Sequence, residues 1–260
     1  MAIAHQEAGG GLSDIRTVFV VLPAYNEAGS LSAVLQTLDR AGHESGIALH
    51  LIVVNDGSSD PTSLVARRYT GTFPLTLIEH PKNLGLGAAI RSGLLAAVDL
   101  ASDFDVVVTM DADDTHTPMV ISLMADRIRG GFDVVIASRY QPGSRVIGVP
   151  LHRRLLSDAA SLLLRTVFPT RGVRDFTCGY RAYRASVLRR AFGLYRDEFI
   201  NQEGFQCMVD ILLKLRCMGL RFTEVPLILR YDRKSGKSKM KVLNTVVKTL
   251  GLVARRRLGR

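Results

Sequence analysis

The 260-residue sequence is poor in several features that define whole classes of protein. It has no tryptophan, and its three cysteines, Cys178, Cys207 and Cys217, include no CxxC pair. That number and spacing argue against a disulfide scaffold or a cysteine zinc site, and they favour a reducing compartment. No apolar run reaches the roughly 18 residues of a membrane span, and residues 1–14 lack the apolar segment of a secretory signal. We therefore expect a cytoplasmic protein that does not cross a membrane but can still lie on one.

Acidic residues are also scarce relative to basic ones. Lysine and arginine number 34 against 24 aspartates and glutamates, which gives a formal net charge of +10 and a pI near 9.9. Such a surface attracts polyanions, namely nucleic acid, nucleotide phosphates or an anionic membrane. The sequence has no RNP-like motif, zinc spacing or basic stripe interleaved with aromatic residues, so no nucleic-acid partner is expected.

The first half of the chain alternates apolar strands with helical patterns. Strands are expected at 17–22, 49–54, 75–79, 104–110 and 133–137, and helices at 28–40, 60–69, 87–98 and 118–129. Repeated units of this spacing predict an α/β fold with a doubly wound, mostly parallel sheet. The later part is expected to hold a mobile loop at 141–150, helices at 151–168, 202–218 and 239–257, and a strand at 221–229.

The most informative feature is the apolar run 106–110, which is followed at once by Asp111, Asp113 and Asp114. Ligands of open α/β sheets bind at the carboxyl ends of the strands, which is where these carboxylates fall. Carboxylates held this close repel one another unless a cation lies among them. A few hard oxygen ligands suit Mg²⁺ or Mn²⁺ shared with substrate phosphates. The cluster predicts a metal and a diphosphate together, and the competing interpretation is a polar turn with a helix cap.

Polar loops follow three other expected strands, at 23–27, 55–60 and 83–87. In a parallel sheet these loops meet the acidic cluster at one edge. There the Tyr25 ring could pack against a nucleotide base, and Asp56 could bind the base or ribose. Gly85 and Gly87 would allow a nucleotide to approach the backbone closely. This is no dinucleotide fingerprint, because the third glycine is replaced by Ile90, and the sequence has no GxxxxGK[ST] motif.

Taken in order, a set of motifs resembles the family 2 glycosyltransferases: VLPAYNEAGSL, VVNDGSSDPT, NLGLGAAIRSGL, MDADDTHTP, ASRY, DFTCGYRAYR and RKSGKSKM. The likeness runs from about residue 18 to residue 240 and is strongest to the dolichyl (polyprenyl) phosphate mannose synthases. It implies the GT-A fold, a Rossmann-like nucleotide-diphospho-sugar transferase, with C-terminal amphipathic helices. The expected division is a disordered tail at 1–14, a GT-A domain at 15–238 and a basic amphipathic helix at 239–260.

The resemblance also implies a site. It assigns the metal to Asp111, Asp113 and Thr115, the acceptor to Arg139, Arg153 and Ser157, and the catalytic roles to Asp113, Arg139 and Arg153. The donor residues that it implies are Pro23, Tyr25, Glu27, Asp56, Asp111, Ala112, Arg233 and Lys239, with Gly236 and Ser238 in the closing loop. Two positions depart from the family, since Thr115 stands where a glutamine ligand is common and Leu86 where a lysine is usual.

The acceptor can be argued from the chemistry of proton transfer. A sugar hydroxyl needs a general base, and family members of that kind carry a Glu–Asp pair on the late helix, which 201–205 lacks. A phosphate monoester is already anionic and needs only cationic contacts. Glu203 and Asp175 nevertheless stay open as bases, and His116 is expected to pack in its loop.

We therefore predict a metal-dependent, inverting transfer of a hexose, first of all mannose from GDP-mannose, onto a polyprenyl phosphate. One alternative is UDP-glucose, another nucleotide sugar or a soluble hydroxyl acceptor, and a second is a non-catalytic subunit that binds a nucleotide sugar. The helix at 151–168 either faces the core or lies at a membrane interface. Arg255, Arg256 and Arg257 are expected to bind anionic lipid on the inner face of the membrane. A separate membrane-anchoring subunit is a further candidate partner.

Overall fold

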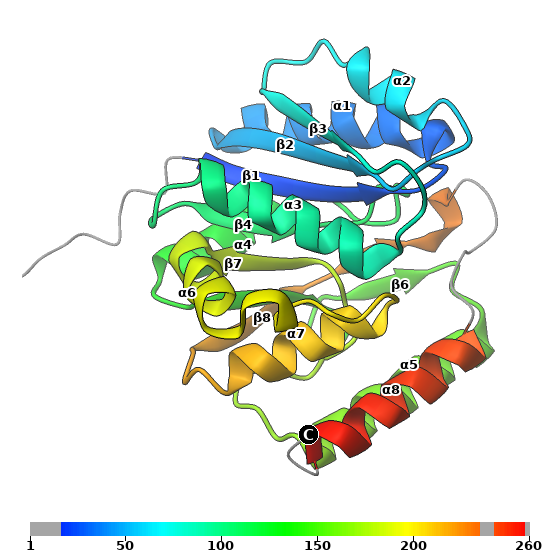
Figure 1. Cartoon of the computed structure of the whole chain (residues 1–260), viewed down its shortest axis with the longest axis vertical. Helices are drawn as coiled ribbons and strands as arrows, with labels where there is room; N and C mark the ends of the chain where they lie inside the picture. Colours follow the sequence, from blue (N-terminus) through cyan, green and yellow to red (C-terminus); the bar gives the residue numbers. More distant parts are fainter. Residues whose placement is uncertain (1–16, 235–241, 258–260) are drawn as a thin grey trace, which may run out of the picture.

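A seven-stranded sheet forms the centre of the molecule (Figure 1). The computed structural model describes residues 17–234 and 242–257, apart from the side chains of 152, 153 and 242–247. Within these residues the strand order is β3-β2-β1-β4-β7-β5-β8, and only β7 runs antiparallel to its neighbours. The strands are β1 (Thr17–Ala24), β2 (Ala48–Asn55), β3 (Leu75–Glu79), β4 (Val106–Thr109), β5 (Val134–Ser138), β7 (Arg181–Arg184) and β8 (Phe222–Pro226).

Helices cover both faces of this sheet, which explains why its central strands are continuous apolar runs. In Figure 1, α3, α6 and α7 lie in front of the sheet, while α1 and α4 lie behind it. All four residues of β4 are buried, as a strand covered on both faces requires. The covering helices are α1 (Ala28–Ser45), α2 (Thr62–Arg67), α3 (Leu86–Leu100), α4 (Val120–Arg129), α6 (Ala185–Tyr195) and α7 (Gln206–Arg216).

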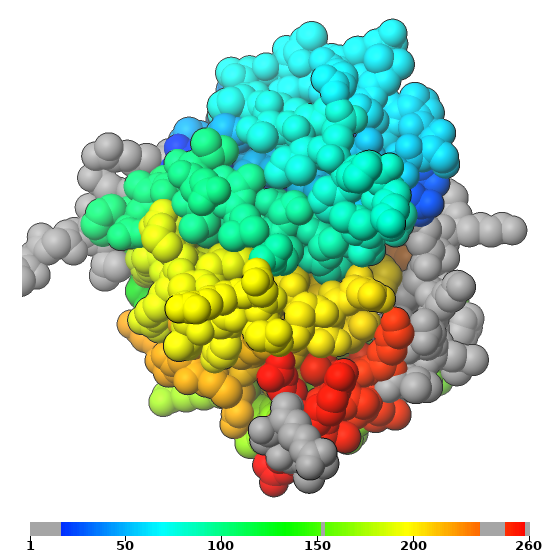
Figure 2. Space-filling view, in the orientation of Figure 1, coloured from blue at the N-terminus to red at the C-terminus, as the bar shows by residue number. Residues whose placement is uncertain are grey.

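Two further helices, α5 (Leu151–Val167) and α8 (Val242–Arg257), lie side by side below the sheet in Figure 1. The space-filling view shows α8 against α7 at this end of the molecule (Figure 2). Leu252 and Val253 of α8 are buried, and Arg256 donates to the buried Asp210 of α7 at 2.8 Å. In the part of the chain that is described, no helix is long and apolar enough to cross a membrane.

The structure confirms the doubly wound, mostly parallel sheet and adds elements that the sequence patterns did not predict. Strand β7 and helix α6 had no predicted counterpart. The expected loop at 141–150 contains the short strand β6 (Arg145–Ile147), and the single strand expected at 221–229 is two, β8 and β9 (Ile228–Arg230). Strand β6 pairs with β9 in a second, two-stranded sheet, because the chain leaves the main sheet after Pro226.

Candidate active site

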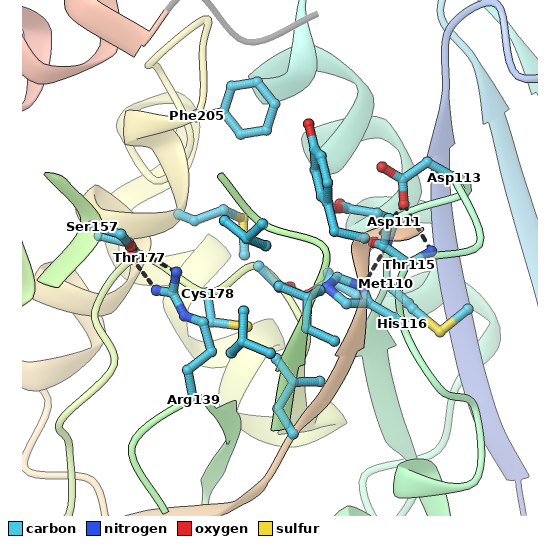
Figure 3. A pocket seen from close by; sticks show the side chains of 18 of the residues that line it. Met110, Asp111, Asp113, Thr115, His116, Arg139, Ser157, Thr177, Cys178 and Phe205 are labelled. Atoms are coloured by element: carbon cyan, nitrogen blue, oxygen red, sulfur yellow. Dashed lines mark hydrogen bonds between the residues drawn. The ribbon is translucent and has the colours of Figure 1, made fainter. Parts of the chain in front are cut away.

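Two adjoining cavities lie at the edge of the sheet where the parallel strands end. The smaller, of about 200 Å³, is lined by six of the expected donor residues and by the expected metal ligand Asp113; the six are Pro23, Tyr25, Glu27, Asp56, Asp111 and Ala112. The larger, of about 430 Å³, is lined by Asp111, Asp113, Thr115, Arg139 and Ser157 among others. Both cavities share Asp111 and Asp113 as well as the ring of Phe205, which projects over the larger one in Figure 3. We call the smaller one the donor pocket and the larger one the acceptor pocket.

The two carboxylates at the boundary of the pockets have different surroundings. Within the described residues, the Asp111 carboxylate receives no hydrogen bond; burial raises its pKa, and the nearby charge of Asp113 adds to the rise. Asp113 Oδ1 instead accepts from Thr115 Oγ1 at 2.7 Å, and its Oδ2 is paired with the ammonium of Lys234. Burial acts to raise the pKa of Asp113, but the charge of Lys234 and the hydrogen bonds from Lys234 and Thr115 outweigh it, so the net shift is downward.

Asp56 organises the glycine-containing loop behind the donor pocket. Its carboxylate accepts from the backbone N–H groups of Leu84 and Gly85, both at 2.9 Å. The ring Nδ1 of His80 lies 2.7 Å from Asp56 Oδ1, and both side chains are nearly buried. Asp56 therefore reaches the donor pocket with both oxygens already engaged, and it fixes the loop that forms one wall.

The two glycines of this loop serve a contact that differs from the one expected. A Cβ on Gly87 would lie 1.7 Å from the carbonyl oxygen of Gln202, and a Cβ on Gly85 would lie 2.7 Å from that of Glu203. Gly87 N–H also donates to the Glu203 carbonyl at 2.9 Å. The glycines thus let the 202–203 backbone pack against the loop, so the expectation that Gly87 serves the nucleotide is corrected. Only Gly85 lines the donor pocket.

Arg139 is held in a network on the other wall, facing the carboxylates across the acceptor pocket (Figure 3). Its Nε and Nη2 donate to both oxygens of Asp175 at 2.8 and 2.7 Å. Nη2 also donates to Thr177, and Nη1 donates to Ser157 Oγ at 2.6 Å. Burial acts to raise the pKa of Asp175, but the guanidinium outweighs it and the pKa is lowered. Among the described residues no acceptor takes the second N–H of Nη1 or the Ser157 hydroxyl proton, so both donors are open to an anion.

Other expected residues fall in different places. Arg153 belongs to α5, but its side chain is outside the description, as are Lys239, Gly236 and Ser238 in full. Arg233 is exposed and lines neither of the two pockets. His116 packs as expected, since its ring stacks on Tyr180 at 4.9 Å between centroids and its Nδ1 accepts from the Asp111 N–H.

Two cations at the site were not predicted. Arg154, one position after Arg153, lines the acceptor pocket. Lys234 directly follows Arg233 and reaches Asp113, which lies 121 residues earlier. A sequence pattern cannot reveal such a pair, because nothing near Lys234 along the chain indicates its partner. The motif RKSGKSKM did indicate that cations in this stretch belong to the site.

Neither residue left open as a base is placed for that role. Glu203 is exposed and lines neither pocket. Asp175 is buried, and both of its oxygens accept from Arg139. A base must reach the proton that it removes within hydrogen-bond distance, so these two carboxylates do not supply one in this geometry.

The fold and the motif residues are those of a GT-A glycosyltransferase. The family model for glycosyl transferase family 2 matches residues 19–192, and the chain belongs to this family. The polyprenol monophosphomannose synthase of Mycolicibacterium smegmatis is 31% identical over 248 residues, which cover 92% of this chain and 89% of that protein. The undecaprenyl-phosphate mannosyltransferase of Micrococcus luteus is 34% identical over 86% of this chain and 87% of that protein. The dolichol-phosphate mannosyltransferase of Pyrococcus furiosus is 32% identical over 86% of this chain but 59% of its own length.

Solved structures agree on the fold. Glucosyl-3-phosphoglycerate synthase from Mycobacterium tuberculosis, in complex with Mn²⁺, UDP and glucosyl-3-phosphoglycerate, gives a TM-score of 0.66. It is 20% identical, with 94% of this chain and 80% of that chain covered. The same enzyme in complex with Mg²⁺ and UDP gives a TM-score of 0.64 at 19% identity, over 94% of this chain and 80% of that chain. At this identity the likeness establishes the GT-A architecture alone.

Proposed function

We propose that this glycosyltransferase moves one hexose, mannose from GDP-mannose as the first candidate, onto the phosphate of a polyprenyl phosphate. The observation that carries the proposal is the opposition of the two walls of the acceptor pocket. Two carboxylates able to hold a metal–diphosphate face an arginine and a serine with donors left for an anion. The names of the three relatives support mannose and a polyprenyl phosphate as the substrates.

A divalent metal, Mg²⁺ or Mn²⁺, fits the residues on the donor wall. The Asp111 carboxylate is half-buried and receives no hydrogen bond from the described residues, and Asp113 lies beside it. Nowhere among the described residues do three or more acidic, histidine or cysteine side chains form a group that could hold a metal. Two carboxylates, with Thr115 close by, suit an ion that completes its shell with waters and substrate phosphates. Such an ion would neutralise the departing diphosphate.

The chain's own residues would then have separate tasks. Asp111 and Asp113 would orient the diphosphate at the boundary of the two pockets, while Pro23, Tyr25, Glu27, Asp56 and Ala112 enclose the rest of the donor. Arg139 and Ser157 would hold the acceptor phosphate, and Arg153, Arg154, Arg233 and Lys239 are the further cations proposed for the phosphates. A phosphate oxygen placed there attacks the anomeric carbon directly, with inversion, and no side chain has to accept a proton.

The exposed face of α5 supports a peripheral position on the inner face of an anionic membrane. Leu151, Leu155 and Leu162 are 70%, 59% and 58% exposed, and Arg154 and Arg165 lie on the same helix. Apolar side chains flanked by arginines suit the boundary of headgroups and acyl chains. Of the C-terminal arginines, Arg255 and Arg257 are proposed to bind lipid headgroups, whereas Arg256 is paired with Asp210. Because α8 packs on α5 and α7, we propose that it acts as part of the GT-A domain at 15–238.

The deciding experiment is a matrix of nucleotide sugars and acceptors. Purified protein is given Mn²⁺ and radiolabelled GDP-mannose, UDP-glucose or another nucleotide sugar, with undecaprenyl phosphate, dolichyl phosphate or a soluble sugar. We expect label in the lipid phase from GDP-mannose alone. Transfer from UDP-glucose, or to a sugar hydroxyl, would instead support the first alternative, and donor binding without any transfer would support a non-catalytic subunit. Activity that requires a co-purified membrane protein would identify an anchoring subunit.

A further inference from the structure

Lys234 occupies a position on Asp113 that a divalent cation would also need. Its ammonium is paired with Asp113 Oδ2, and the two side chains are only 14% and 12% exposed. The same ammonium lies 5.8 Å from the centre of the Tyr231 ring. The pair joins the short helix η2 (Tyr231–Arg233), which Lys234 directly follows, to the loop after β4. It is therefore a partly buried, tertiary ion pair and not an incidental surface contact.

The remaining oxygen of Asp113 is engaged as well. Oδ1 accepts from the backbone N–H of Thr115 at 3.2 Å and from its hydroxyl at 2.7 Å. A divalent ion held between Asp111 and Asp113 would have to share Asp113 with the ammonium. Two cations a few ångströms apart repel strongly where water is scarce, so the ammonium and the metal oppose each other unless further negative charge is present.

We propose that Lys234 is a built-in counter-cation that holds Asp113 when no metal is bound and transfers to the diphosphate when the metal–nucleotide complex enters. This inference rests on the proposed metal-dependent function. A nucleoside diphosphate brings enough negative charge to satisfy both the metal and the ammonium. Free metal alone has to displace Lys234 with nothing in exchange. Metal and nucleotide therefore bind cooperatively, and Lys234 is the residue that couples them.

The neighbouring Arg233 provides a matched comparison. It carries the same charge one position earlier, but it is exposed and lines neither pocket. Removal of either side chain lowers the net charge of the protein by the same amount, so an effect of net charge alone would appear in both variants. Direct competition for Asp113 would be relieved only at Lys234.

The test measures Mn²⁺ binding to the full chain by electron paramagnetic resonance of the free ion and by calorimetry. Lys234→Met, Lys234→Arg and Arg233→Met are compared with the wild type. Without nucleotide, we expect Lys234→Met to bind Mn²⁺ about tenfold more tightly, a free-energy change of about 1.4 kcal/mol, and Arg233→Met to change the affinity less than about twofold. Lys234→Arg, which keeps the charge, should stay near the wild type. Thermal unfolding checks that each variant is folded.

The same titrations are repeated with saturating GDP and, separately, UDP. We expect the nucleotide to tighten Mn²⁺ binding strongly in the wild type and several-fold less in Lys234→Met. Equal Mn²⁺ affinity in the wild type and Lys234→Met, or an equal gain in Arg233→Met, would overturn the role of Lys234 while leaving the metal site standing. Absence of Mn²⁺ binding in every variant, with either nucleotide, would instead overturn the proposed metal-dependent function and this inference with it.

Discussion

The donor and acceptor pockets share a boundary but balance their charges in opposite ways. Four acidic residues, Glu27, Asp56, Asp111 and Asp113, line the donor pocket, and in the described part of the chain Asp113 is paired with the cation Lys234. Across the boundary, the charge of Arg139 is matched by the buried Asp175, which accepts from it through both oxygens. Within the described residues the donor pocket thus has more negative than positive charge, whereas on the acceptor wall the charge of Arg139 is already matched by Asp175.

This difference indicates how the two substrates would be handled. The donor wall can take a diphosphate only together with a cation, because carboxylates and phosphates repel each other. The acceptor wall holds its arginine in place before any ligand arrives, so little side-chain entropy is lost on binding. The donor wall therefore needs an added cation before it can bind its ligand, whereas the acceptor wall already holds its arginine in position. Substitutions on the two sides should therefore have different consequences.

The largest effect is expected where the donor wall loses its shared carboxylate. Asp113→Asn should lower transfer by about 10³-fold or more, since the loss of a metal ligand forfeits several kcal/mol of charge stabilisation. Chelation by EDTA should do the same. The assay is lipid-phase mannosyl transfer, with circular dichroism to verify folding. Asp114→Asn is the matched control, because Asp114 lines neither pocket and its φ of 60° is tolerated by asparagine. Full activity after chelation would refute the metal assignment.

On the acceptor wall, removal of a carboxylate charge should mainly lower the free energy of unfolding. Asp175→Asn leaves Arg139 without its buried counter-charge, which costs about 3 kcal/mol of unfolding free energy, the lower end for a broken buried pair. Urea unfolding measures the change. Asp158→Asn on α5, whose carboxylate accepts a hydrogen bond from the neutral Tyr140 hydroxyl, should cost much less. Similar losses in the two variants would show that the Arg139–Asp175 pair has no special structural role.

The pH dependence of stability follows from the same pair. Folding lowers the pKa of Asp175 below its ordinary value of 3.8, so the ionised carboxyl is the form that stabilises the fold. Its contribution is complete above that ordinary value and is lost as the pH falls through the folded-state pKa. The stability difference between the wild type and Asp175→Asn should therefore shrink below about pH 4.

Prediction from sequence succeeded for the strands and loops around the donor pocket because local patterns decide them. Strand β3 begins and ends at the predicted residues, Leu75 and Glu79, and the loops after β1, β2 and β4 meet at one edge. Strand β7 was missed because its four residues, RAYR, include two arginines. The first of these, Arg181, is fully buried and donates to the carbonyls of Phe176 and Met208. Those partners become neighbours only after the chain folds, so no local pattern indicates the burial.

The candidate site divides in the same way. The motif residues at the donor pocket could be named from the sequence, since each follows a predictable strand. Neither the pairing of Arg139 with Asp175 nor that of Lys234 with Asp113 could be named, because each joins segments distant in the chain. The expectation that Arg256 serves lipid binding was incomplete for the same reason, as its partner Asp210 lies on α7. Charge pattern shows that a cation is present but not which anion it meets.

The proposed membrane contact of α5 should matter on the acceptor side alone, because only the proposed acceptor is a lipid. Leu155 and Leu162 are seven residues apart and lie on one face of α5. Changing both to serine should lower binding to anionic vesicles at least tenfold, given about 1.5–3 kcal/mol for each fully buried leucine. Cosedimentation with vesicles measures it. Leu194→Ser is the control, since Leu194 is 62% exposed on α6. A similar drop in that variant would mean that α5 is not the membrane face.

A smaller effect on stability should distinguish Arg256 from the other arginines of α8. Arg256→Met removes the contact with the buried Asp210, and we expect a loss of about 1 kcal/mol of stability, a modest figure because the arginine is 31% exposed. Arg255→Met and Arg257→Met should leave unfolding unchanged but weaken vesicle binding, and added salt should weaken it further. Thermal unfolding and cosedimentation together make the distinction. Equal destabilisation by all three changes would contradict a specific role for Arg256.

The smallest expected effect concerns Glu203, and it decides between the two acceptor classes. Glu203 is exposed and outside both pockets, so Glu203→Gln should change kcat/KM less than about threefold, against the roughly 10²–10⁴-fold loss that removal of a general base causes. If the nucleophile is a phosphate oxygen, the rate should also be flat above the second phosphate pKa, near 6 by analogy with phosphorylated side chains. A pH profile of kcat/KM for both proteins tests the two expectations together. A large loss in folded Glu203→Gln, with a rate that keeps rising above pH 7, would place a base at residue 203 and favour a hydroxyl acceptor.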